Sequence, residues 1–435
     1  MDKMLIYQML PRLWGKGKFS SVDNETLQYV RSLGMDCVWY TGIPRHSTGQ
    51  PYTKGKCGSP YSICDYYDVN PYMADVESER MEEFILLVAR THDAGLKVIV
   101  DFVPNHVSPD YHDCHGGIRT FDYCDYDWTD TRKIDYGCKD NWLSLRDILL
   151  FWARKGVDGF RCDMVEMVPL DFFRWVIAEV RNLYPDMLFI AEVYSRENYF
   201  PYIREAGFDL LYDKSGIYDI LRSVMTSGTP ASDITGNWLS LGDLQPHMLN
   251  FLENHDEQRL ASPFFAGDAM HGLAALAAAA LLNDASFMLY AGQEVGEDAS
   301  ESQNGRTSIF DLTAVPGLCG LDSFIHTGKG LGKSGRSVLA RYREILHLAA
   351  SPLFRKGKMF DLGYCSGFDR REIFAFARGN GRKTCLVVAN FSNRIQEVTV
   401  VIPPEAVAYL EMKNAAPESG VKVSIPPFGA TVKEI

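Results

Sequence analysis

Carboxylate, guanidinium and imidazole side chains recur at the ends of short apolar segments of this chain. The segment GVDGFRCDMV (156–165) places Arg161 and Asp163 two residues apart, and this spacing puts both on one face of a strand. Three further segments end in DFVPNH (101–106), AEV (191–193) and ENHDEQR (253–259), which carry Asp101, Asn105, His106, Glu192, Asn254, His255, Asp256 and Arg259. Because burying isolated charge is costly, this repeated placement indicates a functional site.

Two carboxylates on adjacent strands suit retaining glycoside hydrolysis, in which one attacks the anomeric carbon and the other donates and then accepts a proton. The two carboxyl groups should lie ~5 to 5.5 Å apart, and neighbouring strands are ~4.8 Å apart. Asp163 and Glu192 can meet this spacing. We expect Arg161 to hold Asp163 ionised, and we expect less charged surroundings for Glu192, which must be protonated. Asp256 would stabilise the positive charge of the transition state.

Other polar and aromatic side chains could hold a sugar beside these acids. His106 and His255 would donate hydrogen bonds to sugar hydroxyls. Tyr61, in the segment GSPYSICDYYDVNP, would stack on a sugar ring. Each residue also has a structural explanation, as an ion pair (Arg161 with Asp163), a helix N-terminal acid, a core histidine or a packed loop residue. A metal site is a further alternative, but the chain has no HxxxH or HxH spacing in support of it.

The elements that must position these residues alternate between apolar strands and amphipathic helices. Eight strand-like segments span residues 4–10, 36–41, 97–102, 157–162, 187–193, 208–212, 248–253 and 286–291. Between them lie helical patterns, such as DFFRWVIAEVRNLY (171–184) with one apolar stripe, and a helix that ends near Gly95. Eight such repeats predict an α/β fold with a closed parallel (β/α)8 barrel, a TIM barrel. The alternative is an open doubly wound sheet, but no GxGxxG follows the first strand.

The alternation of strand and helix patterns is interrupted in two places, and these two segments are predicted to form further domains. Residues 107–140 are polar and aromatic without periodicity, and a loop of this length is usually functional. From residue 353 to residue 435, short strand-like segments separated by Gly, Asn and Pro predict an antiparallel β domain. The barrel would therefore comprise residues 1–106 and 141–352. The segment GLAALAAAALLN (272–283) predicts a tightly packed internal helix.

Composition narrows the classes of partner. The formal net charge of −12 argues against DNA, RNA and anionic membranes, and no run of eighteen apolar residues predicts a membrane span. The ten cysteines are scattered, without CxxC pairs or metal spacing. The N-terminal sequence MDKMLIYQMLPRLW does not have the pattern of a signal peptide, which favours a cytoplasmic protein. A chain that lacks its export signal is the alternative. The sequence does not indicate an oligomeric state.

The segments DFVPNH, GFRCDMV, FIAEV and FLENHD, in this order, resemble the four signature regions of the α-amylase family, glycoside hydrolase family 13. The resemblance extends over nearly the whole chain, from IYQMLPRLW to LYAGQEVGED. It implies that Asp163 is the nucleophile, Glu192 the general acid/base and Asp256 the transition-state stabiliser. It further implies that Arg161, His106, His255 and Tyr61 hold the sugar that is attacked. The implied architecture is a barrel with a short insertion domain after the third strand and a C-terminal β-sandwich.

The chain departs from the family pattern at a calcium site. Many members bind calcium through the asparagine equivalent to Asn105, an insertion aspartate, and the histidine of a Lys-His pair after the nucleophile. Here Glu166 and Met167 stand in place of Lys-His, and the insertion is short. We therefore expect no required cofactor and no calcium; Asn105 would be a ligand if calcium were bound.

The resemblance also bears on substrate. The insertion segment TRKIDY and Met164 both differ from the forms associated with α-1,6 cleavage, which favours α-1,4 bonds. The expected activity is α-amylase-type hydrolysis of maltooligosaccharides or starch, with an α-glucan oligosaccharide as the substrate. The alternatives are a 4-α-glucanotransferase, a maltogenic or cyclomaltodextrinase-like enzyme and an α-1,6-active member of the family. From other classes, the alternatives are a non-catalytic glycan-binding barrel and a metal-dependent barrel hydrolase.

Overall fold

The structure of the chain is a computed structural model that describes residues 2–112, 117–413 and 420–435, so residues 113–116 of the predicted insertion lie outside it. Internal contacts divide the chain into two compact units. The first, called the Asp163 unit below, comprises Ile6–Tyr212 and Ser308–Gly330. The second, called the Asp256 unit, comprises Met1–Leu5, Asp213–Thr307 and Leu331–Ile435.

Eight strands form the closed parallel barrel that the sequence predicts. In order along the chain they are β1 (Leu5–Met9), β2 (Cys37–Tyr40), β5 (Lys97–Phe102), β8 (Gly159–Cys162), β9 (Leu188–Ala191), β10 (Leu210–Tyr212), β11 (Met248–Phe251) and β12 (Ser286–Tyr290). Around the barrel the order is β1-β12-β11-β10-β9-β8-β5-β2. Each of the eight predicted apolar segments contains one of these strands, so the barrel prediction is confirmed.

The register of β5, β8 and β9 brings the predicted catalytic acids to one level. Asp101 is the partner of Arg161 in the β5–β8 pair, and Cys162 is the partner of Ala191 in the β8–β9 pair. The next backbone amides continue this ladder, because Asp163 N–H donates to Phe102 O (2.9 Å) and Glu192 N–H donates to Cys162 O (3.1 Å). Asp163 and Glu192 therefore leave the sheet at the same height on neighbouring strands.

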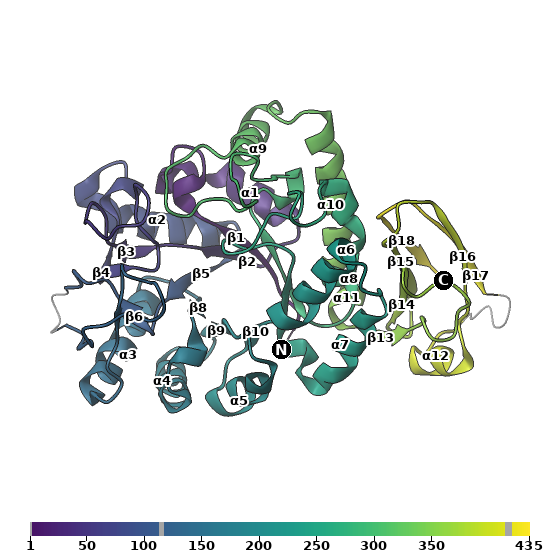
Figure 1. Ribbon diagram of the computed structural model, residues 1–435, viewed down its shortest axis with the longest axis horizontal. Helices are drawn as coiled ribbons and strands as arrows, with labels where there is room; N and C mark the ends of the chain where they lie inside the picture. Colours follow the sequence, from purple (N-terminus) through teal and green to yellow (C-terminus); the bar gives the residue numbers. More distant parts are fainter. Residues whose placement is uncertain (1, 113–116, 414–419) are drawn as a thin grey trace. The chain divides into compact units, whose positions relative to one another are not determined.

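Amphipathic helices cover the outside of these strands (Figure 1), among them α2 (Arg80–Asp93), α3 (Lys139–Arg154) and α4 (Leu170–Leu183). The predicted stripe of α4 is buried from Phe172 to Val180, and Tyr184 at its end is half-buried. After α2 the chain turns at Gly95, which has a φ of +75°. Glycine adopts this left-handed conformation without the steric cost that a Cβ brings, as predicted for the end of this helix.

The insertion between β5 and α3 begins and ends in a short antiparallel pair. β6 (His106–Val107) pairs with β7 (Arg132–Lys133), and His106 is the register partner of Lys133. Outside the named strands, Thr120 forms an isolated bridge with Ile134. The pair attaches the insertion next to the end of β5, where Asn105 and His106 lie.

The alanine-rich segment in the Asp256 unit forms the internal helix that was predicted. All nine residues of α8 (Leu273–Leu281) are buried. Small side chains let neighbouring atoms come close to the backbone, and Asn250 of β11 donates a hydrogen bond to Ala279 O at 2.9 Å. The longer α10 (Lys333–Ala350) of the same unit is amphipathic and buries Val338, Tyr342 and Leu346 among others.

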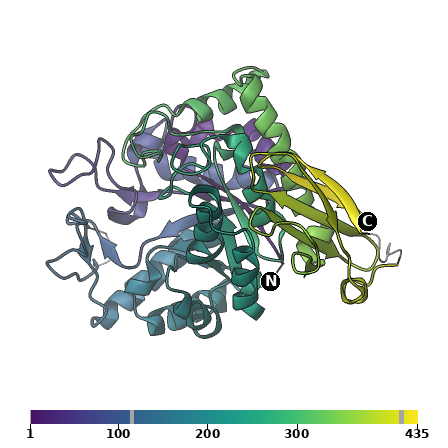
Figure 2. The same ribbon diagram turned by 45° about the vertical axis from the view of Figure 1, so that its right-hand side comes forward.

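The C-terminal part of the Asp256 unit is antiparallel, as predicted. One sheet has the order β13 (Lys358–Asp361), β14 (Ile373–Gly379), β15 (Thr384–Asn390), β18 (Ala430–Glu434), and β16 (Gln396–Val400) pairs with β17 (Val421–Ile425). Figure 2 shows these strands in yellow and yellow-green. Both sheets contribute to one core, with Leu386 and Val388 from one and Val398 and Val423 from the other. The six-residue helix α12 (Pro404–Tyr409) was not predicted.

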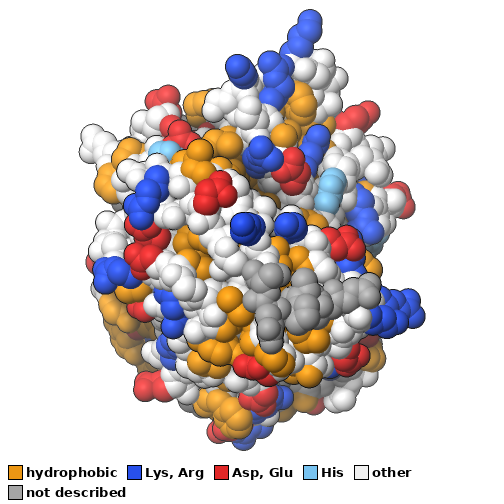
Figure 3. Space-filling view, turned by 90° about the vertical axis from the view of Figure 1, so that its right-hand side faces the viewer, with side chains coloured by type: hydrophobic (Ala, Val, Ile, Leu, Met, Phe, Trp, Pro, Cys, Tyr) orange, Lys and Arg blue, Asp and Glu red, His pale blue; other side chains and the backbone are white. Residues whose placement is uncertain are grey.

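Two observations bear on the predictions about membranes and nucleic acids as partners. In the described part of the chain, no helix has both the length and the apolar character needed to cross a bilayer. On the face drawn in Figure 3, basic and acidic side chains are interspersed and are not gathered by sign.

Candidate active site

One buried guanidinium connects the acids at the ends of three adjacent strands. Arg161 Nη1 lies 2.6 Å from Asp163 Oδ1, and Arg161 Nη2 lies 2.9 Å from Glu192 Oε2. Asp101, at the end of β5, is 3.6 Å from Nη1. All four side chains are buried. The two predicted catalytic acids therefore converge on the two terminal nitrogens of a single side chain, which holds them close together.

The charge around Arg161 is unbalanced. Three carboxylates face one guanidinium, and burial makes unpaired negative charge costly unless other groups compensate it. Burial itself works against the charged guanidinium, but the charge of Glu192 and its neighbours outweighs it and raises the pKa of Arg161 above its usual value. A formal excess of negative charge in a buried space is suited to a ligand or transition state that carries positive charge.

Aromatic rings surround the same guanidinium. Its central carbon lies 5.4 Å from the ring centre of Trp39, 5.3 Å from that of Tyr61 and 5.6 Å from that of Tyr212. Tyr212, at the end of β10, also accepts a hydrogen bond from Arg161 Nε at 3.3 Å. These rings restrict the rotamer of Arg161 and add cation–π attraction. Sequence reasoning missed Trp39 and Tyr212, because neither belongs to a polar segment at a strand end.

The prediction of less charged surroundings for Glu192 is wrong. Besides the ion pair with Arg161, Glu192 Oε2 accepts a hydrogen bond from Met164 N at 2.8 Å, and Oε1 accepts one from Tyr194 OH at 2.7 Å. All three contacts favour the ionised carboxylate. The cause is the register of the barrel, since a long side chain pointing inward from β8 reaches the acids of both its own strand and the next.

The backbone turn after Asp163 provides a hydrogen-bond donor for Glu192. Met164 has a φ of +43°, a left-handed conformation that is uncommon for a residue with a side chain. The N–H of the same residue donates a hydrogen bond to Glu192 Oε2 at 2.8 Å. Backbone strain of this kind persists only where the surrounding structure holds it, and it is concentrated at functional sites.

Glu166 joins the segment after the predicted nucleophile to the loop that carries Glu192. Its Oε2 accepts from Tyr194 N (2.8 Å), and its Oε1 accepts from Ser195 N (3.1 Å) and Asn198 Nδ2 (2.6 Å). In the sequence, Glu166 stands out only as a departure from the family pattern. These three bonds give it a positioning role for the loop of Glu192, a role which its place beside the nucleophile could have suggested.

Tyr61 and His106 lie near this cluster and already have partners. The half-buried Tyr61 donates a hydrogen bond from its hydroxyl to Asp101 Oδ1 at 3.2 Å. His106 is buried, accepts a hydrogen bond from Asn105 Nδ2 (3.1 Å between the nitrogens) and packs against the ring of Trp128 at 5.5 Å. Burial lowers the pKa of His106 to about 4, so its ring is neutral near pH 7. Sugar contacts by Tyr61 and His106 stay predictions.

The Asp256 unit holds the remaining predicted acid on a braced loop. Asn254 Oδ1 accepts from the backbone amides of Asp256 (2.8 Å) and Glu257 (2.9 Å), which forms a tight turn after β11. His255 Nε2 lies 3.0 Å from Asp256 Oδ2, with the histidine side chain fully buried and the aspartate 41% exposed. That Asp256 faces Asp163 and Glu192 stays a prediction.

A second buried ion pair supports this loop. Arg259 Nη1 lies 2.9 Å from Glu253 Oε2, and Leu260 N donates to Glu253 Oε1 at 2.7 Å. The guanidinium also stacks on Tyr290, with 4.0 Å between its central carbon and the ring centre. Burial raises the pKa of Glu253 to about 7 in spite of Arg259. From its place at a strand end, Arg259 was expected in the site, whereas in the structure it supports the loop through its pair with Glu253.

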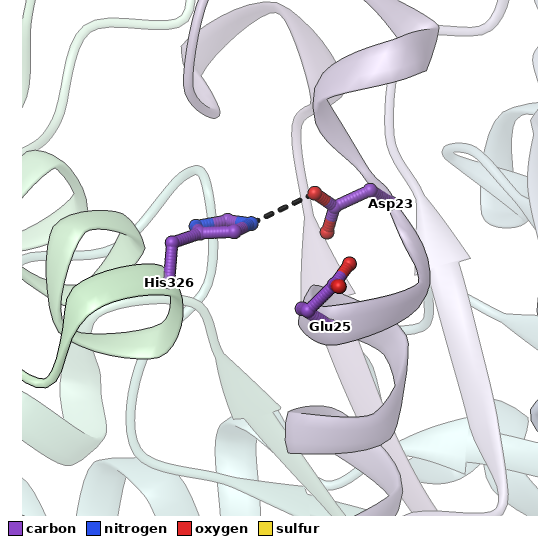
Figure 4. Close-up of side chains that lie close together, drawn as sticks. All are labelled: Asp23, Glu25 and His326. Carbon is purple, nitrogen blue, oxygen red and sulfur yellow. Dashed lines mark hydrogen bonds and ion pairs between the residues drawn. The ribbon is translucent and has the colours of Figure 1, made fainter.

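Among the described residues, one cluster of His and acidic side chains is close enough to hold a metal: Asp23, Glu25 and His326 (Figure 4). His326, on α9 (Pro316–Thr327), contacts Asp23 Oδ2 through Nε2 at 2.7 Å and the backbone oxygen of Asp322 through Nδ1 at 2.8 Å. Both ring nitrogens therefore face oxygen acceptors. This arrangement suits a protonated histidine, which has no lone pair for a metal. The cluster is an ion pair between α9 and the start of α1 (Asn24–Ser32).

This ion pair predicts a pH-dependent contribution to stability. The hydrogen bonds to Asp322 and Asp23 raise the pKa of His326 above its usual value. The contribution is complete below the unfolded pKa of about 6.5 and is lost as pH rises through the raised folded value. His326→Gln should lower the free energy of unfolding at acidic pH by less than about 1 kcal/mol, since both side chains are partly exposed. Urea unfolding of the wild type and of His326→Gln, at a pH below about 6.5 and at a pH above the raised folded pKa, measures this difference in the free energy of unfolding. A difference that grows as pH rises would contradict the prediction.

Comparisons with known proteins identify the class. A closed parallel barrel with polar side chains at the C-terminal ends of its strands is an architecture of enzymes. The family model for the catalytic domain of alpha amylase matches residues 16–144 and 123–313, which together make up more than half of the chain. The chain belongs to the α-amylase family, glycoside hydrolase family 13, a family of enzymes.

Single proteins that are similar to this chain share 20 to 30% of its residues over the matched parts. An alpha-1,4-glucan:maltose-1-phosphate maltosyltransferase of Cereibacter sphaeroides is 30% identical over 238 residues, which cover 47% of this chain and 39% of that protein. The chain thus spans about two fifths of the length of this relative. A cyclomaltodextrinase of Geobacillus thermopakistaniensis is 20% identical over 93% of this chain and 68% of its own length. In fold, the chain is similar to a noncanonic maltogenic alpha-amylase from Thermotoga neapolitana, with a TM-score of 0.74, 21% identity and coverage of 99% of this chain and 98% of that one.

Proposed function

We propose that this protein is a retaining α-glucan-active enzyme that cleaves α-1,4-glucosidic bonds in maltooligosaccharides or starch. In this proposal Asp163 is the nucleophile, Glu192 the general acid/base and Asp256 the transition-state stabiliser. The observation that carries it is the pair of contacts from one guanidinium, Arg161, to Asp163 and Glu192 at 2.6 and 2.9 Å. Carboxyl groups held this close suit attack by one of them on the anomeric carbon, because inverting enzymes leave room for a water between theirs.

The charge of the site supports the same reaction. The transition state of glycoside cleavage has oxocarbenium character, so positive charge develops where the structure has an excess of carboxylates around Arg161. Groups that are already in place stabilise this charge without reorganising at the moment of reaction. The ion pair with Arg161 keeps Asp163 ionised and oriented for attack, and Asp101 in turn holds Arg161 and the hydroxyl of Tyr61.

Glu192 must carry a proton when the glycosidic bond breaks, because it donates one to the leaving oxygen. Its present contacts with Arg161, Met164 N and Tyr194 OH favour the carboxylate. A sugar that enters beside Glu192 excludes water and brings a glycosidic oxygen, which favours the protonated acid as a hydrogen-bond donor. Proton transfer to the leaving oxygen frees the first product. The carboxylate that results then removes a proton from the water or sugar hydroxyl that attacks the glycosyl–Asp163 intermediate.

Transfer to a second sugar is the other candidate. Seven relatives that match about half of the chain are maltosyltransferases, while a relative that matches most of it is a cyclomaltodextrinase. Hydrolysis and transfer share the residues named above and differ in how well water is excluded from the intermediate. We therefore propose hydrolysis for the chain and keep transfer as an outcome of the test.

Proton NMR of a maltotetraose digest tests the proposal. We expect the first reducing ends to have the α configuration, before mutarotation, because two displacements retain the anomeric configuration. Shorter products alone support hydrolysis, and oligomers longer than the substrate support transfer. A first product of β configuration would contradict the proposed roles of Asp163 and Glu192. So would a lack of turnover on starch, maltooligosaccharides, pullulan, cyclodextrin and isomaltose.

A further inference from the structure

The ammonium group of Lys133 lies in the middle of a set of oxygen atoms from three parts of the Asp163 unit. Its Nζ donates to the side-chain oxygen of Asn105 at 2.6 Å and to the backbone oxygen of Met167 at 3.3 Å, and it lies 3.0 Å from Asp125 Oδ2. Asn105 follows β5, Asp125 belongs to the insertion, and Met167 ends the short helix Val165–Met167 after Asp163. Only 17% of the side chains of Lys133 and Asp125 is exposed, and Asn105 is fully buried.

Backbone pairing positions Lys133 beside these oxygen atoms. β7 pairs with β6 so that Lys133 is opposite His106, and the next amide, Ile134 N–H, donates to Asn105 O at 3.1 Å. The Asn105 side chain is oriented by a second bond, from its Nδ2 to Asp125 Oδ2 at 2.9 Å. Its oxygen is therefore turned toward the ammonium. The position of Lys133 is built into the fold and does not depend on a flexible surface side chain.

The residues at this position fit an ammonium and do not fit calcium. Calcium takes six to eight oxygen ligands at about 2.3–2.6 Å, commonly with several carboxylates. Among the residues that the structure describes, three oxygens contact the ammonium, of which one belongs to a carboxylate, and a lysine ammonium has three N–H donors to match them. The single negative charge of Asp125 is neutralised by the single charge of Lys133. A divalent ion in the same place would meet the lysine at contact distance.

We propose that Lys133 is an internal cation that takes the structural place of a metal ion and ties the insertion to the segment after Asp163. Asn105, which the sequence marked as a calcium ligand, is one of its oxygen partners. Lys133 is a positioning residue, because it acts on the turn after Asp163 through Met167 O and on His106 through the β6–β7 pair. The insertion then keeps its place without a bound metal, and the family resemblance alone would not predict this.

Thermal unfolding of the full chain tests the proposal with matched variants. Lys133→Ala removes four side-chain atoms, from Cγ to Nζ, that correspond to n-propylammonium, whereas Lys133→Met removes the charge and keeps the length. Lys97→Ala, which removes an exposed lysine at the start of β5, is the control. We expect Tm to fall by several degrees in both Lys133 variants and to stay unchanged in Lys97→Ala. Adding n-propylammonium chloride should raise the Tm of Lys133→Ala toward that of the wild type, and should leave Lys133→Met and the wild type unchanged.

Metal addition and chelation complete the test on the wild-type protein, which needs no variant to fold. The Tm of the wild type should be the same in EDTA and in calcium chloride, and calorimetric titration with calcium should show no binding. A Tm that falls in EDTA and recovers with calcium would overturn the proposal. Unchanged Tm values for both Lys133 variants would also overturn it, as would the absence of any rescue of Lys133→Ala by n-propylammonium. These readouts are independent of catalysis, so they remain decisive if the proposed function fails.

Discussion

Replacing Asp163 by asparagine is expected to reduce kcat on maltooligosaccharides about 10⁴-fold or more, a loss of about 5.5 kcal/mol of transition-state stabilisation. A carboxamide has no negative charge with which to attack the anomeric carbon, so no glycosyl–enzyme intermediate can form. Asparagine keeps the size of the side chain and an oxygen that can accept the bond from Arg161 Nη1. The main loss should therefore be in rate and not in folding. Steady-state kinetics and thermal unfolding of the purified variant measure the two separately.

The matched control for this variant is Asp171→Asn on α4. Asp171 has a side chain that is 76% exposed and pairs with Arg174 on the helix surface. Its replacement makes the same chemical change at an exposed helix surface and should leave kcat within about twofold of the wild type, since exposed pairs contribute little. If Asp163→Asn retained near-normal turnover, the assignment of Asp163 as the nucleophile would be wrong.

Replacing Glu192 by glutamine is expected to lower kcat on maltooligosaccharides by about 10³-fold, within the range that general acid–base groups contribute. The effect should depend on the leaving group. A sugar leaving group needs a proton, whereas fluoride leaves without one, so the first step with α-maltosyl fluoride should be much less impaired. Glutamine can still accept the bond from Met164 N through its carbonyl oxygen, and its NH2 group can donate to the hydroxyl oxygen of Tyr194, which preserves the loop. The release of fluoride and of sugar from the two substrates, followed in parallel, measures this difference.

Glu197→Gln provides the control for this second variant, because Glu197 is an exposed residue in the short helix Arg196–Asn198 of the same loop. Its rates on both substrates should match those of the wild type. Equal losses of Glu192→Gln on the fluoride and on the oligosaccharide would indicate that Glu192 acts only by holding Arg161, and the general-acid role would then have to be abandoned.

The contacts of Glu192 explain why its chemistry could not be derived from the sequence. A strand end that reads FIAEV places a carboxylate at the barrel mouth, and this placement follows from period-two burial and needs no tertiary detail. Which charges lie near it depends on the neighbouring strand. Arg161 reaches Glu192 because β8 and β9 are in register from Gly159 and Leu188, and this register arises only when the sheet closes. The expectation of less charged surroundings for Glu192 failed for this reason.

The local pattern of the sequence determined the eight barrel strands, the stripe of α4, the internal helix α8 and the acids that follow β8 and β9. Each of these depends on periodic burial or on a residue's place at the end of a strand, and both are properties of neighbouring residues. The tertiary structure alone decided the ring of Trp39, Tyr61 and Tyr212 around Arg161, the loop brace by Glu166 and the placement of Lys133 beside Asn105. These contacts join residues far apart in the chain, and their geometry is set by strand register and side-chain reach, which become defined only when the whole barrel packs.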